Sequence, residues 1–497
     1  MSKKVVIIGA GLGGLECGYI LAKNGYDITV LEHDKIVGGC LQSFRRGKAL
    51  FDTGFHYVGG LREGESLHGL FRYFDLLSLP WQQLDEDCFD EVVIGNKSYP
   101  FANGHQRFVE RLVEYFPHEK EGLKRFVKQL KEVGEHLPDS FLPRQTEEFY
   151  ANSLFARSAY NWLNDTIHDP TLRKILSGTS LKMELNAERL PLYVFAQINN
   201  SFIQSAWRIK GGGGQIAEHL AESIRQMGGT IRVNATVTSI VERGGKAIGV
   251  RINREEFMPA DYIIAAQHPQ ALMSLLADSQ VIRNIYRRRI SNLKNSFGMF
   301  TANIRLKPDC IKYENKNIFV HTPDADLWNV NSEKAKSVMV SYYAPSTENS
   351  ADFSPAIDLL TPLRWYQVAQ WAAEPQGRRG ESYVNFKNKK TEECLNLVEK
   401  RIPELRGSID AIFTSTPLSY HHYTLTQNGS AYGIQKDWQS PITTVLSPRT
   451  PIPNLLLTGQ NLNLHGVLGT SMTSVFTCAE ILGMDNLSEQ LDVKHWK

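Results

Sequence analysis

The chain has 497 residues, of which 42% are hydrophobic and 22% are charged, and its formal net charge is +2. This length exceeds what one hydrophobic core usually supports, so we expect two or three intertwined structural units. The near-neutral charge provides no global field that would attract nucleic acid, and we therefore expect no nucleic-acid partner.

The six cysteines lie far apart, without a CxxC pair or a Cys/His cluster at metal-ligand spacing. This pattern favours a reduced, cytoplasmic protein without a metal site, and the adjacent His421 and His422 have no third ligand at useful spacing. No stretch approaches the roughly 18 apolar residues that a membrane-spanning helix needs. Peripheral contact with a membrane stays open.

The first forty residues follow the order strand, glycine turn, helix, strand and acid. Residues 3–9 form a β-branched apolar run, typical of a buried parallel strand, and a helical pattern covers residues 15–23 after the turn. Glycines in such a turn let the backbone approach a diphosphate, and an acid about 20 residues later binds the ribose hydroxyls of an adenine dinucleotide. The alternative is a doubly wound fold with an empty turn. The predicted contacts are Gly9, Gly11, Gly13, Gly14, Glu32 and His33.

A paired glycine, Gly38-Gly39, follows six residues after Glu32 and leads into CLQSFRRGKALFDTGFHYVGG. At this point the sequence resembles the superfamily of FAD enzymes that includes amine oxidases and phytoene desaturases. The resemblance implies non-covalently bound FAD rather than NAD, with the loop after the glycines passing over the flavin. Cys40 replaces the usual arginine, so we expect Arg45 or Arg46 to take its place. The implied cofactor contacts here are Gly38, Gly39, Arg45 and Gly54.

Residues 96–204 carry helical patterns, at 106–115 and at 119–136, and a group of aromatic residues lies between residues 141 and 207. A carbon–carbon double bond offers no handle for an ion pair, so an enzyme acting on it needs an apolar pocket beside the flavin. These aromatic residues are candidates for that pocket wall, and ordinary core is the alternative. They are Phe141, Phe149, Tyr150, Phe155, Tyr160, Trp162, Tyr193, Phe195, Phe202 and Trp207.

A second glycine-rich block, at 207–214, precedes a helical pattern at 215–227 and strands at 237–241, 247–252 and 261–266. The resemblance implies that the FAD domain returns here and that the backbone of Val237 contacts adenine.

Four arginines, at 283 and 287–289, alternate with apolar residues between 281 and 290. A basic amphipathic helix on an anionic lipid surface has this pattern, which centres on Arg287, and so does an ordinary solvated helix face.

The segments STPLSY at 415–420 and GSAYG at 429–433 resemble the carotenoid and retinoid branch of the superfamily: phytoene desaturases, carotenoid isomerases and retinol saturases. This resemblance implies hydride transfer between flavin N5 and a hydrophobic polyene or isoprenoid, as saturation, desaturation or isomerisation. A last block follows, with a strand at 454–458 and a glycine-introduced helix after His465, whose N–H groups would face the flavin. The implied contacts are Gly459, Gln460, Gly469 and Thr470, with Gln460 in place of the usual acid.

The candidates for a catalytic acid or base are His56, Tyr57, Tyr432 and His465, because each lies in a segment that should close over the flavin.

The fold class we expect is α/β: a Rossmann-like FAD-binding domain of the glutathione-reductase type with an inserted α+β substrate domain. The FAD domain comprises residues 1–95, 205–275 and 410–486, and the substrate domain residues 96–204 and 276–409. Two other functions stay open, a flavin amine oxidase and a non-catalytic isoprenoid carrier with bound FAD. The electron partner, which is NAD(P)H, a quinone or oxygen, and the oligomeric state are also open.

Overall fold

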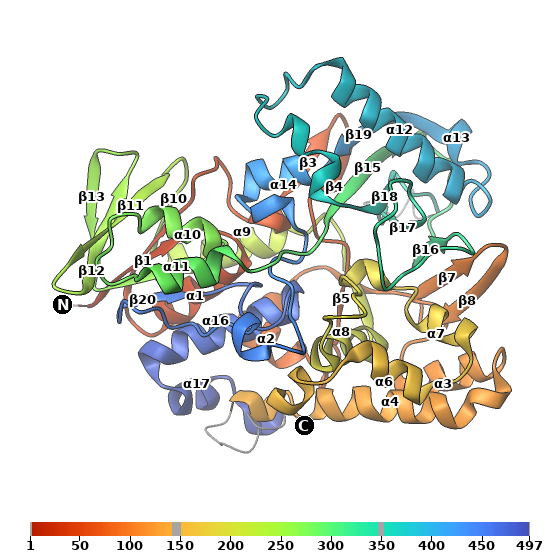
Figure 1. The fold of residues 1–497 in the computed structure, drawn as a ribbon, viewed down its shortest axis with the longest axis horizontal. Coiled ribbons are helices and arrows are strands. Elements are labelled where there is room, and N and C mark those ends of the chain that lie inside the picture. The colour runs from red at the N-terminus through yellow and green to blue at the C-terminus, as the bar shows by residue number, and fades with distance from the viewer. Residues whose placement is uncertain (1, 142–150, 346–351, 497) are drawn as a thin grey trace.

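Two β-sheets and a helical layer make up most of the molecule (Figure 1). The structure is a computed structural model and describes residues 2–141, 151–345 and 352–496. The first sheet lies at the N-terminal side of the picture. The second sheet and the helical layer lie on the opposite side.

The first sheet has five parallel strands in the order β10-β2-β1-β14-β20. Its central strands are buried on both faces, as the apolar run at residues 3–9 predicts. Helix α1 packs closely on α9, since a Cβ at Gly18 would lie 2.9 Å from the Ile224 side chain. The bounds are β1 Lys4–Ile8, β2 Asp27–Leu31, β10 Thr230–Arg232, β14 Tyr262–Ala265, β20 Leu455–Leu457, α1 Leu12–Lys23, α9 Gly214–Gln226, α16 Gly466–Leu482 and α17 Met484–Gln490.

The other face of this sheet is covered by a three-stranded antiparallel sheet and two helices, which share a hydrophobic core with it. Arg287 points inward and donates to the carbonyls of Met273 and Leu276 at the end of α10, so it is not part of an exposed basic face. Ile285 is 78% exposed on the same helix. The bounds are β11 Val237–Arg243, β12 Lys246–Ile252, β13 Glu256–Pro259, α10 Pro269–Leu275 and α11 Asn284–Ser291.

The second sheet has seven strands in the order β19-β15-β18-β17-β16-β7-β8, and every pairing except β16 with β7 is antiparallel. Helix α12 packs against one face. The bounds are β7 Asp90–Ile94, β8 Lys97–Phe101, β15 Gly298–Leu306, β16 Asn317–His321, β17 Ser337–Tyr342, β18 Ala356–Leu363, β19 Ile409–Ser415, α12 Gly380–Val398 and α13 Leu405–Ser408.

The remaining helices and short strands complete the molecule, and the helices predicted at 106–115 and 119–136 correspond to α3 and α4. The bounds are α2 His68–Tyr73, α3 His105–Val113, α4 Lys120–Glu135, α6 Ala159–Thr166, α7 Pro170–Leu176, α8 Leu192–Gln204, α14 Pro417–Thr424, α15 Pro441–Thr444, β3 Ser43–Arg46, β4 Ala49–Asp52, β5 Val58–Gly59, β6 Trp81–Gln83 and β9 Ala206–Ile209.

Two strand pairings differ from the expected domain boundaries. The pairing of β7 with β16 places residues 90–94 in the second sheet, before the boundary expected at 95, and the pairing of β19 with β15 places residues 410–415 there too, inside the expected third segment of the FAD domain. We therefore propose that the first segment of the FAD domain ends before Asp90 and that the third begins after Ser415, and the remaining domain boundaries stay proposals.

Candidate functional site

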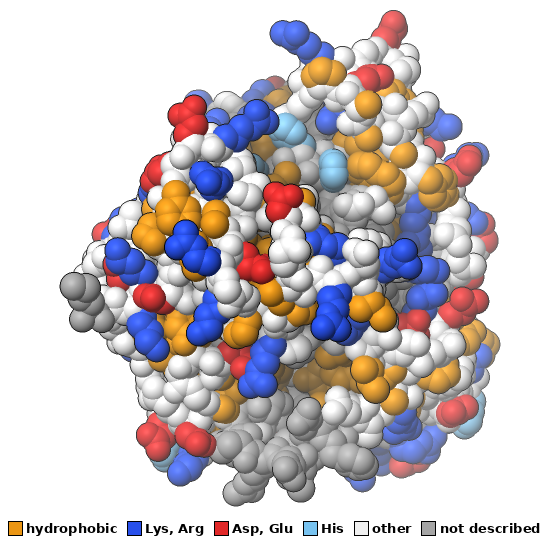
Figure 2. All heavy atoms as spheres, turned by 60° about the vertical axis from the view of Figure 1, so that its left-hand side comes forward, with side chains coloured by type: hydrophobic (Ala, Val, Ile, Leu, Met, Phe, Trp, Pro, Cys, Tyr) orange, Lys and Arg blue, Asp and Glu red, His pale blue; other side chains and the backbone are white. Residues whose placement is uncertain are grey.

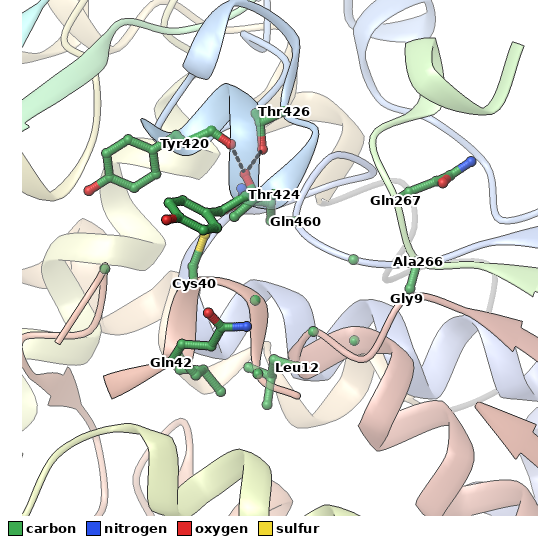
Figure 3. A pocket seen from close by; sticks show the side chains of 18 of the residues that line it. Gly9, Leu12, Cys40, Gln42, Ala266, Gln267, Tyr420, Thr424, Thr426 and Gln460 are labelled. Atoms are coloured by element: carbon green, nitrogen blue, oxygen red, sulfur yellow. Dashed lines mark hydrogen bonds between the residues drawn. The ribbon is translucent and has the colours of Figure 1, made fainter. Parts of the chain in front are cut away.

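The parallel strands of the first sheet all end at one edge, and a cavity of about 310 Å³ lies there. Gly9 follows β1, Glu32 follows β2, Ala266 follows β14 and Gly459 comes two residues after β20. Ligands of open parallel sheets bind beyond the carboxyl ends of the strands, because loops there can diverge and expose backbone groups. We call it the nucleotide cavity, because the sequence predicts that a dinucleotide binds there. Figure 3 looks into it, with Gly9 and Ala266 on one side and Cys40 on the other.

Most of the residues predicted to contact the cofactor line the nucleotide cavity: Gly9, Gly11, Gly13, Glu32, His33, Gly38, Gly39, Gly54, Val237, Gly459, Gln460 and Thr470. Gly14 and Gly469 lie behind it, where a Cβ would come within 2.0 Å of the Gly9 carbonyl oxygen and 2.3 Å of the Leu464 carbonyl oxygen. Their role in the structure is close packing. Arg45 lines a different cavity, so its predicted contact with FAD has no support from the geometry.

The glycine turn leaves room for a ligand at one position in particular. Gly9 has φ +102°, which other residues rarely adopt, and a Cβ at Gly11 would meet no protein atom within 4 Å. Gly11 is the N-cap of α1, so the free N–H groups of the first turn face the cavity that Gly11, Leu12 and Gly13 line. An anionic diphosphate satisfies such groups.

Glu32 is held rigidly at the end of β2. Its carboxylate accepts hydrogen bonds from the backbone N–H groups of Ala10, at 2.8 Å, and Asp34, at 2.9 Å, and pairs with His33 Nδ1 at 2.8 Å. Burial raises the pKa of Glu32, but these hydrogen bonds outweigh burial and leave its pKa below the usual value. The carboxylate is thus ionised and oriented to accept from hydroxyl groups.

Helix α16 points its N-terminus at the same cavity, where Gly466, Val467 and Thr470 line the wall. The N-cap residue His465 makes no side-chain cap, and the first turn carries no acid. The helix therefore offers partial positive charge to a group in the cavity, as the resemblance implies for the flavin.

Several residues of the nucleotide cavity were not among the predicted contacts. Ala266, Gln267 and His268 follow β14, and the rule that ligands bind beyond strand ends could have found them. The side-chain amide nitrogen of Gln267 is buried and has no hydrogen-bond partner among the described residues. This unpaired donor, the open space at Gly11 and the ionised Glu32 together fit an adenine dinucleotide.

A second cavity, of about 150 Å³, adjoins the nucleotide cavity, and we call it the inner cavity. The two share Phe55, His56, Leu181, Met339 and Tyr432. The remaining walls of the inner cavity are mainly apolar and include Leu67, Ile198, Phe202, Leu464 and Leu468.

One buried ion pair lies in the wall of the inner cavity. Lys182 Nζ is 2.8 Å from Asp90 Oδ2, which also accepts from the Tyr57 hydroxyl at 3.0 Å. Asn317 donates to the other oxygen of Asp90 at 3.1 Å. Burial lowers the pKa of Lys182 while Asp90 opposes this, and burial together with Asp90 raises that of Tyr57. Nothing in the sequence signals this pairing of residues 92 positions apart.

The structure brings the four predicted catalytic residues together but gives them different partners. Tyr432 donates to the Leu181 carbonyl, and His465 Nε2 donates to the Lys182 carbonyl at 3.2 Å. His56 lines both cavities, and its Nδ1 is 4.0 Å from Asp358. Burial lowers the pKa of His56 to about 4 and raises that of Asp358 to about 7, so the imidazole is neutral at pH 7.

Most of the aromatic residues predicted as candidates for the pocket wall pack against other side chains and do not line either cavity. Phe202 lines the inner cavity, whereas Trp162 and Phe195 pack on Phe126 in the helical layer. Phe149 and Tyr150 lie outside the described residues.

Comparisons with known proteins identify the class. The model of the family named flavin containing amine oxidoreductase matches residues 12–350. All-trans-retinol 13,14-reductase from Homo sapiens is 25% identical, over 98% of this chain and 86% of its own length, and the Danio rerio enzyme of that name is 27% identical, over 97% and 86%. Prolycopene isomerase 2 from an Oncidium hybrid cultivar is 23% identical, over 86% and 74%.

Solved structures agree on the fold. An oxidoreductase from Methanosarcina mazei superposes with a TM-score of 0.65 at 16% identity, covering 95% of this chain and 98% of its own. Putrescine oxidase bound to putrescine gives 0.64 at 14% identity, covering 97% and 99%. The predicted α/β fold, with a Rossmann-like sheet and a mixed substrate-domain sheet, is confirmed.

The chain belongs to the flavin containing amine oxidoreductase family. This confirms the predicted superfamily, and it implies FAD as the cofactor, which the nucleotide cavity fits.

No helix in the described parts of the chain is long and apolar enough to cross a membrane. Among the same residues, no three His, Cys, Asp or Glu side chains are grouped so that they could hold a metal ion.

Proposed function

We propose that this protein is an FAD-dependent oxidoreductase that acts on carbon–carbon double bonds of a hydrophobic polyene or isoprenoid, as a saturase, desaturase or isomerase. The observation that carries the proposal is the mainly apolar inner cavity, which adjoins the nucleotide cavity and shares walls with it. The full-length similarity to all-trans-retinol 13,14-reductases and prolycopene isomerases supports the same substrate class.

The polar groups of the inner cavity weigh against an amine substrate. Asp90 could pair with an alkylammonium ion, but its carboxylate is already paired with Lys182 and bonded to Tyr57. The ammonium group of Lys182 lies 4.3 Å from the ring centre of Phe202, on a wall that an amine would have to approach. A second cation there would be repelled.

Different residues of the chain bind the cofactor and transfer the proton in the proposed reaction. Glu32 and the N-terminus of α1 hold the nucleotide, and the N-terminus of α16 faces the cavity from the other side. When bound, FAD supplies hydride transfer at N5. The neutral imidazole of His56 takes a proton from the neighbouring carbon in desaturation, and Asp358 stabilises the imidazolium that forms. In saturation the ring first takes up a proton, with the Asp358 carboxyl as its source, and then gives that proton to the carbon.

The test uses the protein loaded with FAD, reduced anaerobically with dithionite and mixed with all-trans-retinol or with a carotenoid. We expect reoxidation of the flavin and a product two mass units heavier for at least one polyene. Isomerisation would instead give a product of unchanged mass. Oxidised protein mixed with the same polyenes tests desaturation, which would reduce the flavin and give a product two mass units lighter. An unchanged flavin and an unchanged polyene with both the reduced and the oxidised protein would indicate a carrier, and peroxide release from amines would indicate an amine oxidase.

We also propose that the substrate enters from a lipid surface. Ile285 and Ile442 are 78% and 88% exposed, and Arg289 of α11 donates to the Ile442 carbonyl at 3.0 Å, so the two side chains belong to neighbouring elements. Figure 2 shows basic and hydrophobic side chains interspersed on this side of the molecule. Flotation with anionic and neutral liposomes tests this. Binding to neither would reject it, and Ile285→Ser with Ile442→Ser should reduce binding.

A further inference from the structure

A third cavity, of about 220 Å³, adjoins the other two at Phe55 and His56, which line all three. Its remaining walls come from the β3–β4 hairpin, from β9 and the segment after it, and from the end of β17. The function proposed above does not use this cavity.

Three cations line this third cavity. Arg45 and Lys48 are exposed on the hairpin, whereas Arg208 is only 5% exposed. Asp52 is the one acid among the lining residues, and it already accepts from the Ser43 hydroxyl and the Gly213 N–H. Burial raises the pKa of Asp52 to about 6, so the cavity keeps a net positive charge.

Arg208 is a buried guanidinium group whose partners are neutral. It donates to the Tyr313 hydroxyl at 3.1 Å and to Asn317 Oδ1 at 2.6 Å, and its Nε has no partner. None of the three cations forms an ion pair with a carboxylate in residues 2–141, 151–345 or 352–496. Burying a guanidinium group costs free energy unless an anion compensates it. A ligand anion would supply that compensation.

We propose that the third cavity binds an oxyanion, a carboxylate or a phosphate, between Arg45, Lys48 and Arg208, on a ligand whose remaining part reaches His56. Guanidinium groups suit both oxyanions because they can donate two parallel hydrogen bonds. Two sources have this chemistry: the carboxylate end of an oxidised polyene and the phosphates of a nicotinamide dinucleotide acting as electron donor.

The experiment measures dissociation constants by calorimetry on the FAD-loaded protein and on three variants, Arg45→Gln, Lys48→Gln and Arg46→Gln. Arg46 is the matched control because it is exposed on the same hairpin, and its guanidinium lies over the rings of Phe44 and Phe413 rather than in the cavity. The probes are all-trans-retinoate, all-trans-retinol, NADPH and inorganic phosphate. Retinol serves as the neutral counterpart of retinoate.

We expect Arg45→Gln and Lys48→Gln each to weaken oxyanion binding about threefold to tenfold, and more at low than at high salt. Weakening of retinoate alone identifies a carboxylate ligand, and weakening of NADPH and phosphate identifies a phosphate ligand. Retinol binding should not change. The inference is overturned if no oxyanion probe loses more affinity in these variants than in Arg46→Gln. The phosphate arm does not depend on polyene turnover, so failure of the proposed function would be seen separately.

Discussion

The nucleotide cavity and the inner cavity meet at His56 but are built in different ways. At its phosphate end the nucleotide cavity is lined by glycines of short continuous motifs, Gly9, Gly11, Gly13, Gly38 and Gly39. The inner cavity is formed by side chains from segments far apart in the chain, such as Tyr57, Lys182, Met339 and His465. The difference teaches that a site made of backbone can be recognised from local sequence, whereas a site made of side chains depends on the tertiary fold.

The largest effect on stability is expected at Gly14, where the start of helix α1 lies close to the backbone of Gly9. In Gly14→Ala the new Cβ would lie 2.0 Å from the Gly9 carbonyl oxygen, so strand and helix must separate. We expect a loss of more than about 3 kcal/mol of stability and little FAD-binding protein. Chemical unfolding and flavin absorbance measure this.

Gly11→Ala is the matched variant, because its Cβ meets no protein atom within 4 Å. It should fold normally and bind FAD more weakly, since the methyl group occupies ligand space. If both variants bound FAD as tightly as the wild type, the backbone of the glycine turn would not contact the cofactor.

Substitutions in the buried ion pair of Lys182 and Asp90 test the inner cavity, whose walls are formed by side chains. Lys182→Met leaves Asp90 buried with only neutral partners, Tyr57 and Asn317, and should cost about 3–5 kcal/mol of stability in urea unfolding. The double variant Lys182→Met, Asp90→Asn should recover most of the loss. A double variant as unstable as the single one would mean that Lys182 acts through packing rather than charge.

His56 is the residue on which the proposed chemistry depends. His56→Gln should slow reoxidation of reduced flavin by the polyene by about 100-fold or more, with the flavin spectrum unchanged. Tyr432→Phe is the control in the same wall, because the Tyr432 hydroxyl is already engaged by the Leu181 carbonyl. Equal slowing in both variants would contradict the proposed role of His56 in proton transfer.

The smallest effect concerns Glu16 on α1, which accepts from the hydroxyls of Ser471 and Ser474 on α16. Burial raises the pKa of Glu16 to about 8 from the usual 4.5, so the folded state binds the extra proton between these values. The stability that this carboxyl contributes is therefore complete below pH 4.5 and is lost as pH rises through 8.

Glu16→Gln cannot titrate, so the wild type should lose on the order of 2 kcal/mol relative to this variant between pH 5 and pH 6.5. Urea unfolding at the two pH values measures the difference. A constant difference would show that Glu16 is already ionised in the folded protein at pH 5.

The sequence by itself determined the nucleotide-binding half of the molecule. Residues 3–32 carry strand, turn, helix, strand and acid in order, and each element follows from local periodicity or from the conformations that only glycine allows. Val237 and Gln460, which the sequence predicts as cofactor contacts because each follows a recognisable motif, line the nucleotide cavity, and their contact with FAD stays a prediction.

Only the tertiary structure decided how the side chains meet. The pairing of Lys182 with Asp90 depends on where the segment after α7 lies against β7, which no local pattern encodes. Arg45 was expected at the flavin, but the β3–β4 hairpin places it in the wall of the third cavity, which Arg208, 163 residues later in the chain, also lines. Sheet order and helix packing fix such contacts, because they bring together residues whose separation along the chain carries no information about their distance in space.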